Sequence, residues 1–356
     1  MAVIVLSVGL AVIFLPQESF SENENRMLTT WGDIDLVSEL SRGTLGERLS
    51  ALYSDQFPLR ATLIEGKAAA EILFGKFENG GVMLGRDGAL IPRGEYSAAE
   101  KENLRKNLDA IDKFCKSAGA SVTFAVAPRA VDVLKSRLPR VFSPKRAASA
   151  WELFDGTEFV DLKKFIDGDG NNWFLTDHHW TARGAYLAYA ALSDQLGYEP
   201  FSDFEAETVS ESFCGTSWSK SGMYGTRPDK IELMRFRGDE KFYVTDGEIT
   251  VSGLYNEEKL ETKDKYGVFL GGDYGHIKIS NGEEKPRLLV VKDSYFNALA
   301  PFLCRHFELD VIDLRYFSGS VAKYAREQGI DEILILCGID SLASAPTFQA
   351  LLYGTK

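Results

Sequence analysis

The last quarter of the chain places the strongest constraint on the fold, because strands and helices alternate there. Apolar runs predict buried strands at 287–291, 309–314 and 332–337, and helical patterns occupy 295–304 and 320–328 between them. Consecutive strands that are joined by helices form parallel sheets with right-handed crossovers. The sequence therefore predicts an α/β domain in which helices flank a parallel sheet.

Two earlier segments fit this plan. Residues 121–127 (SVTFAVA) form an apolar run that predicts a further buried strand. Residues 97–118 predict a helix, because Ser97 and Glu100 match a capping box at its start. Residues 201–282 differ, since they combine many Gly, Thr and Tyr residues with short alternating runs. We interpret this segment as an irregular β-rich insertion between two halves of one domain.

Composition narrows the classes of protein to consider. Of 356 residues, 45% are apolar and 26% are charged, which is typical of a soluble globular protein. The net charge of -12 argues against nucleic acid as a partner, because nucleic acid binding needs clustered Lys and Arg. No cysteine belongs to a CxxC pair, which argues against a zinc ribbon or a redox motif. We expect buried free thiols, and disulfides are the alternative. The four cysteines are Cys115, Cys214, Cys304 and Cys337.

The first 16 residues (MAVIVLSVGLAVIFLP) are apolar and uncharged. A bilayer span needs about 20 such residues, and a signal peptide starts with basic residues that this segment lacks. A buried core segment is the alternative, but the polar stretch at 19–26 follows at once. We favour a signal anchor or a remnant of one, followed by a helical connector at 17–80 and a domain at 81–356 outside the cytoplasm.

Ser294 lies between the predicted strand 287–291 and the helix that follows it. In an open parallel sheet, ligands bind at the carboxyl ends of the strands. Free backbone N–H groups at a helix N-terminus can also hold a developing oxyanion. Ser294 is therefore a candidate nucleophile, and an ordinary N-cap is the alternative.

The tetrapeptide Asp177-His178-His179-Trp180 holds two of only four histidines in the chain. An activated serine needs a base, and the base needs a carboxylate that fixes its tautomer. Asp177 and His179 can supply both from one turn, because residues two apart in an extended turn point the same way. Trp180 would wall the site and exclude water.

Two other interpretations of this tetrapeptide remain open. Asp177, His178 and His179 could be metal ligands, but adjacent histidines rarely converge on one ion, and no cysteine or further histidine lies near in the sequence. The histidines could also be structural hydrogen-bonding groups. We therefore predict no metal at this position.

The segment TDHHW at 176–180 resembles the DHHW protein family, which is named for this tetrapeptide. Further segments that resemble the family span nearly the whole chain. They are SENENR near residue 20, DQFPLR at 55–60, GVMLGRDG at 81–88, FLGG at 269–272, VVKDSYFNALAPFL at 290–303 and VIDLRYF at 311–317. The family is similar to the alginate O-acetyltransferases of the SGNH hydrolase class.

This resemblance implies an SGNH-hydrolase-like (flavodoxin-like) α/β fold for residues 81–356. It also implies Asp177 as the orienting carboxylate, His179 as the general base and Ser294 as the nucleophile. An Asp-x-His pair that precedes the catalytic serine is the order found in the alginate enzymes. No cofactor is implied.

The sequence departs from the pattern of the family at two places. The usual Gly-Asp-Ser around the nucleophile is Lys292-Asp293-Ser294 here. Asp273 stands where we expect Asn, which puts in doubt the oxyanion or substrate contact usually assigned to that position. Arg315 lies at the pocket rim or pairs with a nearby carboxylate, Asp313 or Asp293. The candidates for oxyanion or substrate contacts are Tyr295, Gly272, Asp273, His276, Arg315, His178 and Trp180.

A Ser-His-Asp site takes up an acyl group as an acyl-serine and releases it to an acceptor. The expected function is O-acetylation of a cell-surface or exopolysaccharide. The alternatives are a polysaccharide deacetylase or esterase, and a carbohydrate-binding envelope protein without catalysis. The expected partners are a polysaccharide acceptor, an acetyl donor and the membrane through the N-terminal anchor, with no nucleic acid.

Overall fold

The chain is described from a computed structural model. The structure describes residue 12, residues 15–168 and residues 171–353, apart from the side chain of Arg146. The apolar segment 1–16, interpreted as a signal anchor, lies almost entirely outside these residues. In the part of the chain that is described, no helix is long and apolar enough to cross a membrane.

The centre of the molecule is an eight-stranded mixed sheet in the order β11-β10-β12-β14-β13-β15-β6-β7. Neighbours from β14 to β7 pair in parallel, while β12, β10 and β11 add antiparallel strands at one edge. The strands are β6 (Ser121–Ala127), β7 (Val160–Asp161), β10 (Tyr243–Thr245), β11 (Thr250–Ser252), β12 (His276–Ser280), β13 (Arg287–Lys292), β14 (Glu308–Ile312) and β15 (Glu332–Gly338). The predicted α/β fold with a parallel sheet is confirmed.

Apolar residues alternate between the two faces of the sheet. Odd-numbered residues of β13 and β15, such as Leu289 and Ile333, pack with one face of α5 (Ala98–Ser117). The side chain of Ser97 accepts a hydrogen bond from the Glu100 amide, and Glu100 completes the predicted capping box. Helices α12 (Val321–Gln328) and α13 (Ile339–Ser344) pack on the same side.

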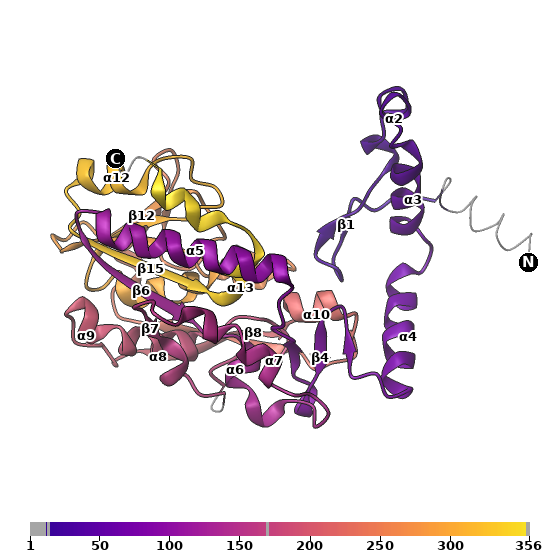
Figure 1. Cartoon of the computed structure of the whole chain (residues 1–356), viewed down its shortest axis with the longest axis horizontal. Coiled ribbons are helices and arrows are strands. Elements are labelled where there is room, and N and C mark those ends of the chain that lie inside the picture. The colour runs from indigo at the N-terminus through magenta and orange to yellow at the C-terminus, as the bar shows by residue number, and fades with distance from the viewer. Residues whose placement is uncertain (1–11, 13–14, 169–170, 354–356) are drawn as a thin grey trace, which may run out of the picture.

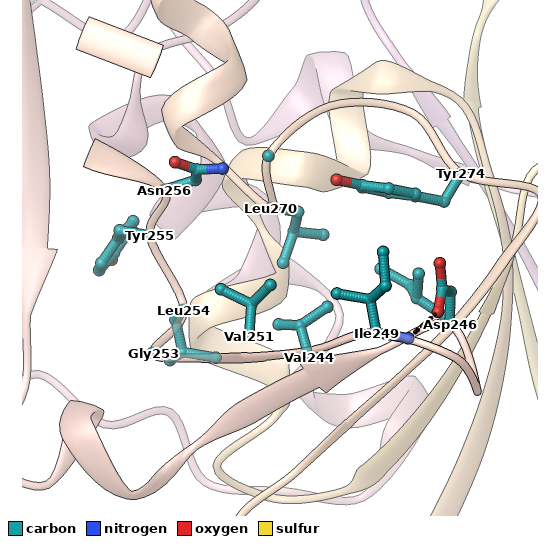
Figure 2. A pocket seen from close by; sticks show the side chains of 12 residues that line it. Val244, Asp246, Ile249, Val251, Gly253, Leu254, Tyr255, Asn256, Leu270 and Tyr274 are labelled. Atoms are coloured by element: carbon teal, nitrogen blue, oxygen red, sulfur yellow. Dashed lines mark hydrogen bonds between the residues drawn. The ribbon is translucent and has the colours of Figure 1, made fainter. Parts of the chain in front are cut away.

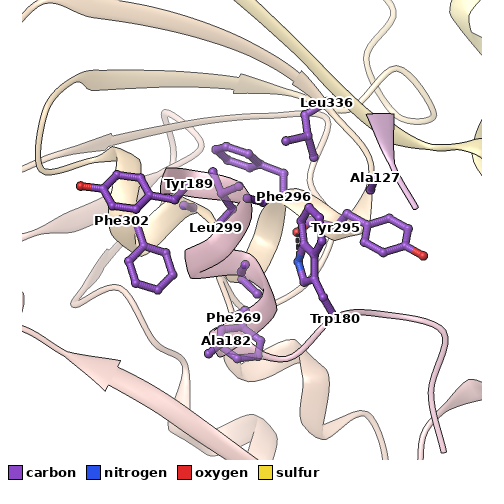
Figure 3. Close-up of a cluster of buried hydrophobic side chains, with 14 of the residues drawn as sticks. Ala127, Trp180, Ala182, Tyr189, Phe269, Tyr295, Phe296, Leu299, Phe302 and Leu336 are labelled. Carbon is purple, nitrogen blue, oxygen red and sulfur yellow. Dashed lines mark hydrogen bonds between the residues drawn. The ribbon is translucent and has the colours of Figure 1, made fainter. Parts of the chain in front are cut away.

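The opposite face of the sheet carries the even-numbered residues and supports the segment that holds Ser294. Leu336 and other strand residues pack there with α8 (Ala182–Ala191), η9 (Ser294–Ala298) and α11 (Ala300–Leu303). Figure 3 shows aromatic side chains, among them Tyr295, gathered in this layer. The nucleophile candidate is therefore mounted on a rigid, fully packed layer.

The helix predicted at 295–304 is two short helices, η9 and α11. Pro301 has no backbone N–H with which to continue a helix through this position, but it fits the first turn of α11. The predicted helix is therefore interrupted at one turn residue, Leu299, between a 3-10 segment and an α-helical segment.

The segment 201–282 is β-rich, as predicted. Strands β8 (Glu205–Phe213) and β9 (Asp229–Arg235) form a separate two-stranded sheet with register shifts near Ser210. Strands β10, β11 and β12 instead extend the central sheet, because β12 pairs with β14. The segment thus contributes directly to the main sheet as well as to a separate ribbon.

The N-terminal connector is built of helices and lies to one side of the central sheet in Figure 1. Arg26 bonds Asp55 at 2.6 Å and Arg60 bonds Glu24 at 2.7 Å, which ties its pieces together. Its helices are α2 (Leu36–Arg42), α3 (Leu45–Asp55) and α4 (Arg60–Leu73), with the short strands β1 (Phe20–Ser21) and β2 (Arg26–Met27). The domain boundaries near 16 and 80 stay predictions.

A small separate sheet and several short helices account for further parts of the described chain. A three-stranded sheet holds β3 (Glu78–Asn79), β4 (Val82–Leu84) and β5 (Leu90–Pro92), and Ala68 of α4 packs on it. The remaining α-helices are α6 (Ala130–Val133), α7 (Lys145–Ala148), α9 (Ser193–Leu196) and α10 (Thr216–Ser221). The four cysteines are free in the structure, with Cys304 and Cys337 buried.

Candidate active site

Ser294 lies at the carboxyl end of β13, directly after the strand. Asp293 is the N-cap of η9, and its side chain accepts a hydrogen bond from the Tyr295 amide at 3.0 Å. Ser294 is the first residue of that helix and is half-buried, so its hydroxyl stays reachable. The predicted position at the rim of the parallel sheet is observed.

A tight loop presents Asp177 and His179 to the same rim. Trp173 and Trp180 form an isolated antiparallel bridge at its base, and the Phe174 amide donates to the His179 carbonyl at 3.3 Å. Helix α8 begins directly after the loop, where the Thr181 side chain accepts from the Gly184 amide. These contacts fix both ends of the loop, so its tip has little freedom.

The three residues of the predicted triad form one continuous hydrogen-bonded chain. His179 Nε2 lies 2.7 Å from Ser294 Oγ, and His179 Nδ1 lies 2.5 Å from Asp177 Oδ1. Asp177 and His179 are both buried, with 1% and 5% of their surfaces exposed. Both ring nitrogens of His179 are thus occupied, in the arrangement that lets a histidine remove a proton from a serine.

The second oxygen of Asp177 is held by Thr216, at the start of α10. The Thr216 amide and hydroxyl donate to Asp177 Oδ2 at 2.6 and 2.9 Å. Burial by itself raises the pKa of Asp177, but the neighbouring His179 and His178 and these donors outweigh burial and hold the pKa well below its usual range. Asp177 is therefore ionised at neutral pH and stabilises a positive charge on His179.

Aromatic groups lock the base and the nucleophile in place. The Tyr266 ring stacks on His179 with centroids 4.1 Å apart and an interplanar angle of 7°, and its hydroxyl donates to the Ser294 carbonyl at 3.2 Å. Trp180 is fully buried and donates from Nε1 to the Tyr295 carbonyl at 3.0 Å. Trp180 therefore lies directly behind the segment that carries Ser294, and its role as a wall of the site stays a prediction.

His178 is turned away from Ser294. Its Nδ1 lies 2.5 Å from Thr216 Oγ1, and because that hydroxyl donates to Asp177, the Nδ1–H donates to Thr216. Burial lowers the pKa of His178 to about 4, and the neighbouring His179 acts in the same direction. His178 is therefore neutral at neutral pH, and its carbonyl accepts from the Tyr295 hydroxyl at 2.8 Å.

Metal-ligating atoms of Asp177, His178 and His179 lie within 4.8 Å of one another. Such a group could in principle hold an ion. Here the nitrogen of His179 nearest the carboxylate bonds Asp177, and His178 Nδ1 bonds Thr216. In the described structure these nitrogen atoms therefore take part in hydrogen bonds within the protein.

Among the remaining candidates, Asp273 and Arg315 lie in an ionic network beneath Ser294. Lys292 Nζ is 2.7 Å from Asp273 and 3.4 Å from Asp313, and Arg315 Nη2 is 2.9 Å from Asp273 and 2.6 Å from Asp313. Of the two carboxylates weighed as partners of Arg315, the structure pairs it with Asp313. Lys292, which replaces the usual glycine, anchors this network.

Gly272 belongs to a turn that delivers Asp273 to this network. Leu270, Gly271 and Gly272 have φ values of 61°, 78° and 129°, so three successive residues adopt left-handed backbone. Leu270 and Gly271 also line a small apolar cavity of about 90 Å³ beside the β10–β11 hairpin (Figure 2). The turn is thus supported by apolar packing on one side and by ion pairs on the other.

The contacts of His276 and Tyr295 do not match the oxyanion role for which the sequence made them candidates. His276 lies in β12, where its Nε2 is 3.4 Å from Asp310 and its ring packs against Tyr324. The Tyr295 amide is already bonded to Asp293. Tyr295 instead supports the site through its ring, 5.1 Å from that of His179, and through its hydroxyl.

Sequence reasoning missed Thr216 and Tyr266, which contact the triad from the β-rich segment. Thr216 is 39 residues from Asp177, and Tyr266 is 28 residues from Ser294. Neither residue belongs to a motif with a chemical meaning. Their roles depend on tertiary contacts that no local pattern in the sequence signals.

Gly215 offers a test of whether the position of the Asp177 carboxylate controls Ser294. A Cβ at Gly215 would lie 2.2 Å from Asp177 Oδ2 and 2.4 Å from Asp177 Cβ, so the buried carboxylate would have to move. We expect Gly215→Ala to slow the reaction of Ser294 with a sulfonyl fluoride about 100-fold, the cost of an ångström-scale misplacement. Overpacking should also lower the melting temperature.

The matched control is Gly225→Ala, because the nearest atom to a Cβ there is Glu65 Oε1 at 4.0 Å. It should change neither the labelling rate, which mass spectrometry measures, nor the melting temperature, which thermal unfolding measures. Unchanged labelling in Gly215→Ala would mean that the position of Asp177 does not control Ser294.

The fold and the site define an α/β protein of the SGNH hydrolase-like class. A family model described as DHHW protein matches residues 165–312. A second model, described as SGNH hydrolase-like domain, acetyltransferase AlgX, matches residues 82–225. The predicted resemblance to the DHHW family, and to AlgX-type SGNH domains, is confirmed.

Solved structures show the same fold. A DHHW family protein from Eubacterium siraeum superposes with a TM-score of 0.62 and 20% identity, covering 77% of this chain and 95% of that chain. PatB1 from Bacillus cereus gives a TM-score of 0.60 and 19% identity over 75% and 98% of the chains. The structure of PatB1 from Bacillus cereus with a sulfonyl adduct gives a TM-score of 0.57 and 18% identity, covering 75% of this chain and 97% of that chain. No curated protein matches this chain.

Proposed function

We propose that this chain is a serine acyltransferase of the SGNH type, which O-acetylates an extracytoplasmic polysaccharide through an acetyl-Ser294 intermediate. The observation that carries the proposal is the continuous hydrogen-bonded chain from Asp177 through His179 to Ser294. The match to a family model described as an acetyltransferase supports acetyl as the transferred group. The apolar segment 1–16 supports a location outside the cytoplasm.

In the first half-reaction, Ser294 Oγ attacks the carbonyl carbon of the acetyl donor while its proton passes to His179 Nε2. The tetrahedral intermediate then collapses, the bond to the leaving group breaks, and the leaving group takes the proton from His179. Asp177 keeps the Nδ1–H tautomer of His179 and stabilises the imidazolium. The product is acetyl-Ser294.

In the second half-reaction, an acceptor hydroxyl gives its proton to His179 Nε2, and its oxygen bonds to the acetyl carbon. Ser294 Oγ leaves and regains the proton. A sugar hydroxyl as acceptor makes the protein a transferase, and water as acceptor makes it an esterase. The esterase is the second candidate function, because the same three residues serve both reactions.

The experiment uses p-nitrophenyl acetate as a surrogate donor, with mass spectrometry of the protein. We expect one acetyl group on Ser294, slow release in buffer, faster release on addition of glycan oligomers, and acetyl esters on the glycan. Ser294→Ala is the control and should remain unmodified.

Two results would change the assignment. Fast release that no glycan accelerates would favour the esterase. No acetyl-enzyme at all, with glycan binding retained in Ser294→Ala, would favour a carbohydrate-binding protein without catalysis.

A further inference from the structure

A groove of about 640 Å³, with several charged side chains in its wall, lies beside the proposed triad. His178 and Thr216 belong to its wall, and both contact Asp177, so the groove lies next to the carboxylate of the proposed triad. The rest of the wall comes from the sheet β3–β5, the start of α5, α10 and α13. The volume is in the range of ligand sites and far exceeds that of the apolar cavity in Figure 2.

Negative charge prevails in this groove. Four carboxylates against two cations leave a formal charge of minus two, and His178 adds none at neutral pH because its pKa is about 4. The carboxylates are Glu78, Glu95, Glu100 and Asp340, and the cations are Arg93 and Lys220. A ligand with many carboxylates would meet repulsion here.

Two carboxylates of the protein already neutralise the charge of Arg93. Its Nη1 lies 2.7 Å from Glu78 and its Nη2 lies 3.0 Å from Glu95. Both terminal nitrogens therefore face carboxylates, which leaves little attraction for a carboxylate of a ligand. One oxygen of Asp340 accepts a hydrogen bond from the Tyr96 hydroxyl.

Two buried polar atoms of the wall have no hydrogen-bond partner among the described residues. They are Ser217 Oγ, in a residue that is only 1% exposed, and Arg93 Nε. A buried polar atom without a partner costs free energy, which a bound hydroxyl group relieves. Ser217 and Arg93 are both wall residues of the groove, so a hydroxyl group of a bound sugar is a candidate partner for these atoms.

We propose that this groove holds the acceptor glycan, and that it selects sugars with free amino groups over uronic acids. The proposal rests on the proposed function and names its acceptor class. Ammonium groups of the glycan face the carboxylates Glu100 and Asp340, and hydroxyl groups reach Ser217. The groove thereby directs a neighbouring sugar hydroxyl toward His179.

The binding test uses Ser294→Ala, so that no acyl transfer intervenes. Calorimetry would compare tetramers of glucosamine, N-acetylglucosamine and mannuronate, which are cationic, neutral and anionic. We expect affinity to fall in that order, and the advantage of the glucosamine tetramer to shrink at high salt as screening increases. Equal affinities, a preference for mannuronate, or no binding of any tetramer would overturn the proposal.

Variants of the groove carboxylates localise the effect. Glu100→Gln keeps the capping box, and Asp340→Asn keeps an oxygen for the Tyr96 hydroxyl. Each should weaken glucosamine binding about two- to fivefold, the range for partly exposed ion pairs. The control Glu327→Gln, on the exposed face of α12, should have no effect.

An equal loss in the control would overturn the proposal. Failure of the acyl-transfer proposal is distinguishable, because it would appear as absent acetyl-Ser294 in the unmodified protein while the order of glycan affinities persisted.

Discussion

Replacing His179 by alanine should slow acetylation of Ser294 by p-nitrophenyl acetate by about five to six orders of magnitude. The size of the effect follows from removal of a general base that acts as a unit with its serine. His179 Nε2 lies 2.7 Å from Ser294 Oγ, whereas the Nδ1 of His178 is engaged with Thr216. Stopped-flow release of p-nitrophenol would measure the rate.

The adjacent histidine is the natural control for this substitution. His178→Ala should keep most of the acylation rate, because His178 bonds Thr216 and not Ser294. A large loss in His178→Ala with activity retained in His179→Ala would transfer the role of base to His178. Equal, modest losses in both variants would indicate that the histidines only support the loop.

Asp177→Asn should lower the same rate by about 10⁴-fold, as expected when an orienting carboxylate becomes an amide. Asp177 Oδ1 accepts from His179, and Oδ2 accepts the Thr216 amide and hydroxyl. An asparagine must turn its NH₂ toward one of these sides. If the NH₂ group faces Thr216, it meets two other hydrogen-bond donors. If it faces His179, it selects the tautomer with hydrogen on Nε2, and that nitrogen cannot take the proton of Ser294.

Asp229→Asn supplies a matched control, since Asp229 is also a largely enclosed carboxylate of this region. It accepts from the Leu175 and Thr176 amides and does not bond His179. We expect this variant to lower thermal stability and to lose much less activity than Asp177→Asn. Comparable rate losses would show that loop integrity, and not the tautomer of His179, controls the reaction.

The sequence predicts those parts of the fold that local pattern determines. Apolar runs mark β13 and β15, and the Ser97–Glu100 capping box marks the start of α5. Pro301 breaks the following helix because it lacks an N–H, which the apolar pattern alone did not reveal. The pairing of β12 with β14 depends on a strand of five residues whose partner lies far along the chain.

The same distinction holds for the site. Ser294 and the Asp177–His179 pair stand out because a strand end and a rare histidine pair mark them. Thr216 and Tyr266 carry no such mark, yet they hold the carboxylate and stack on the base. They lie in the β-rich segment, where sequence gives little periodicity, so only the packed structure reveals them.

The proposed base and nucleophile are separated by 115 residues of chain, and β8 to β13 lie between them. A nascent chain that ends anywhere before residue 294 holds the base without a nucleophile. A chain that ends between residue 294 and β15 contains both groups, but it still lacks the Gly338 amide and the Ser341 hydroxyl, which bond Asp293. The proposed reactivity of Ser294 therefore depends on residues as far along the chain as Ser341, and labelling of Ser294 would report that β15 has joined the sheet.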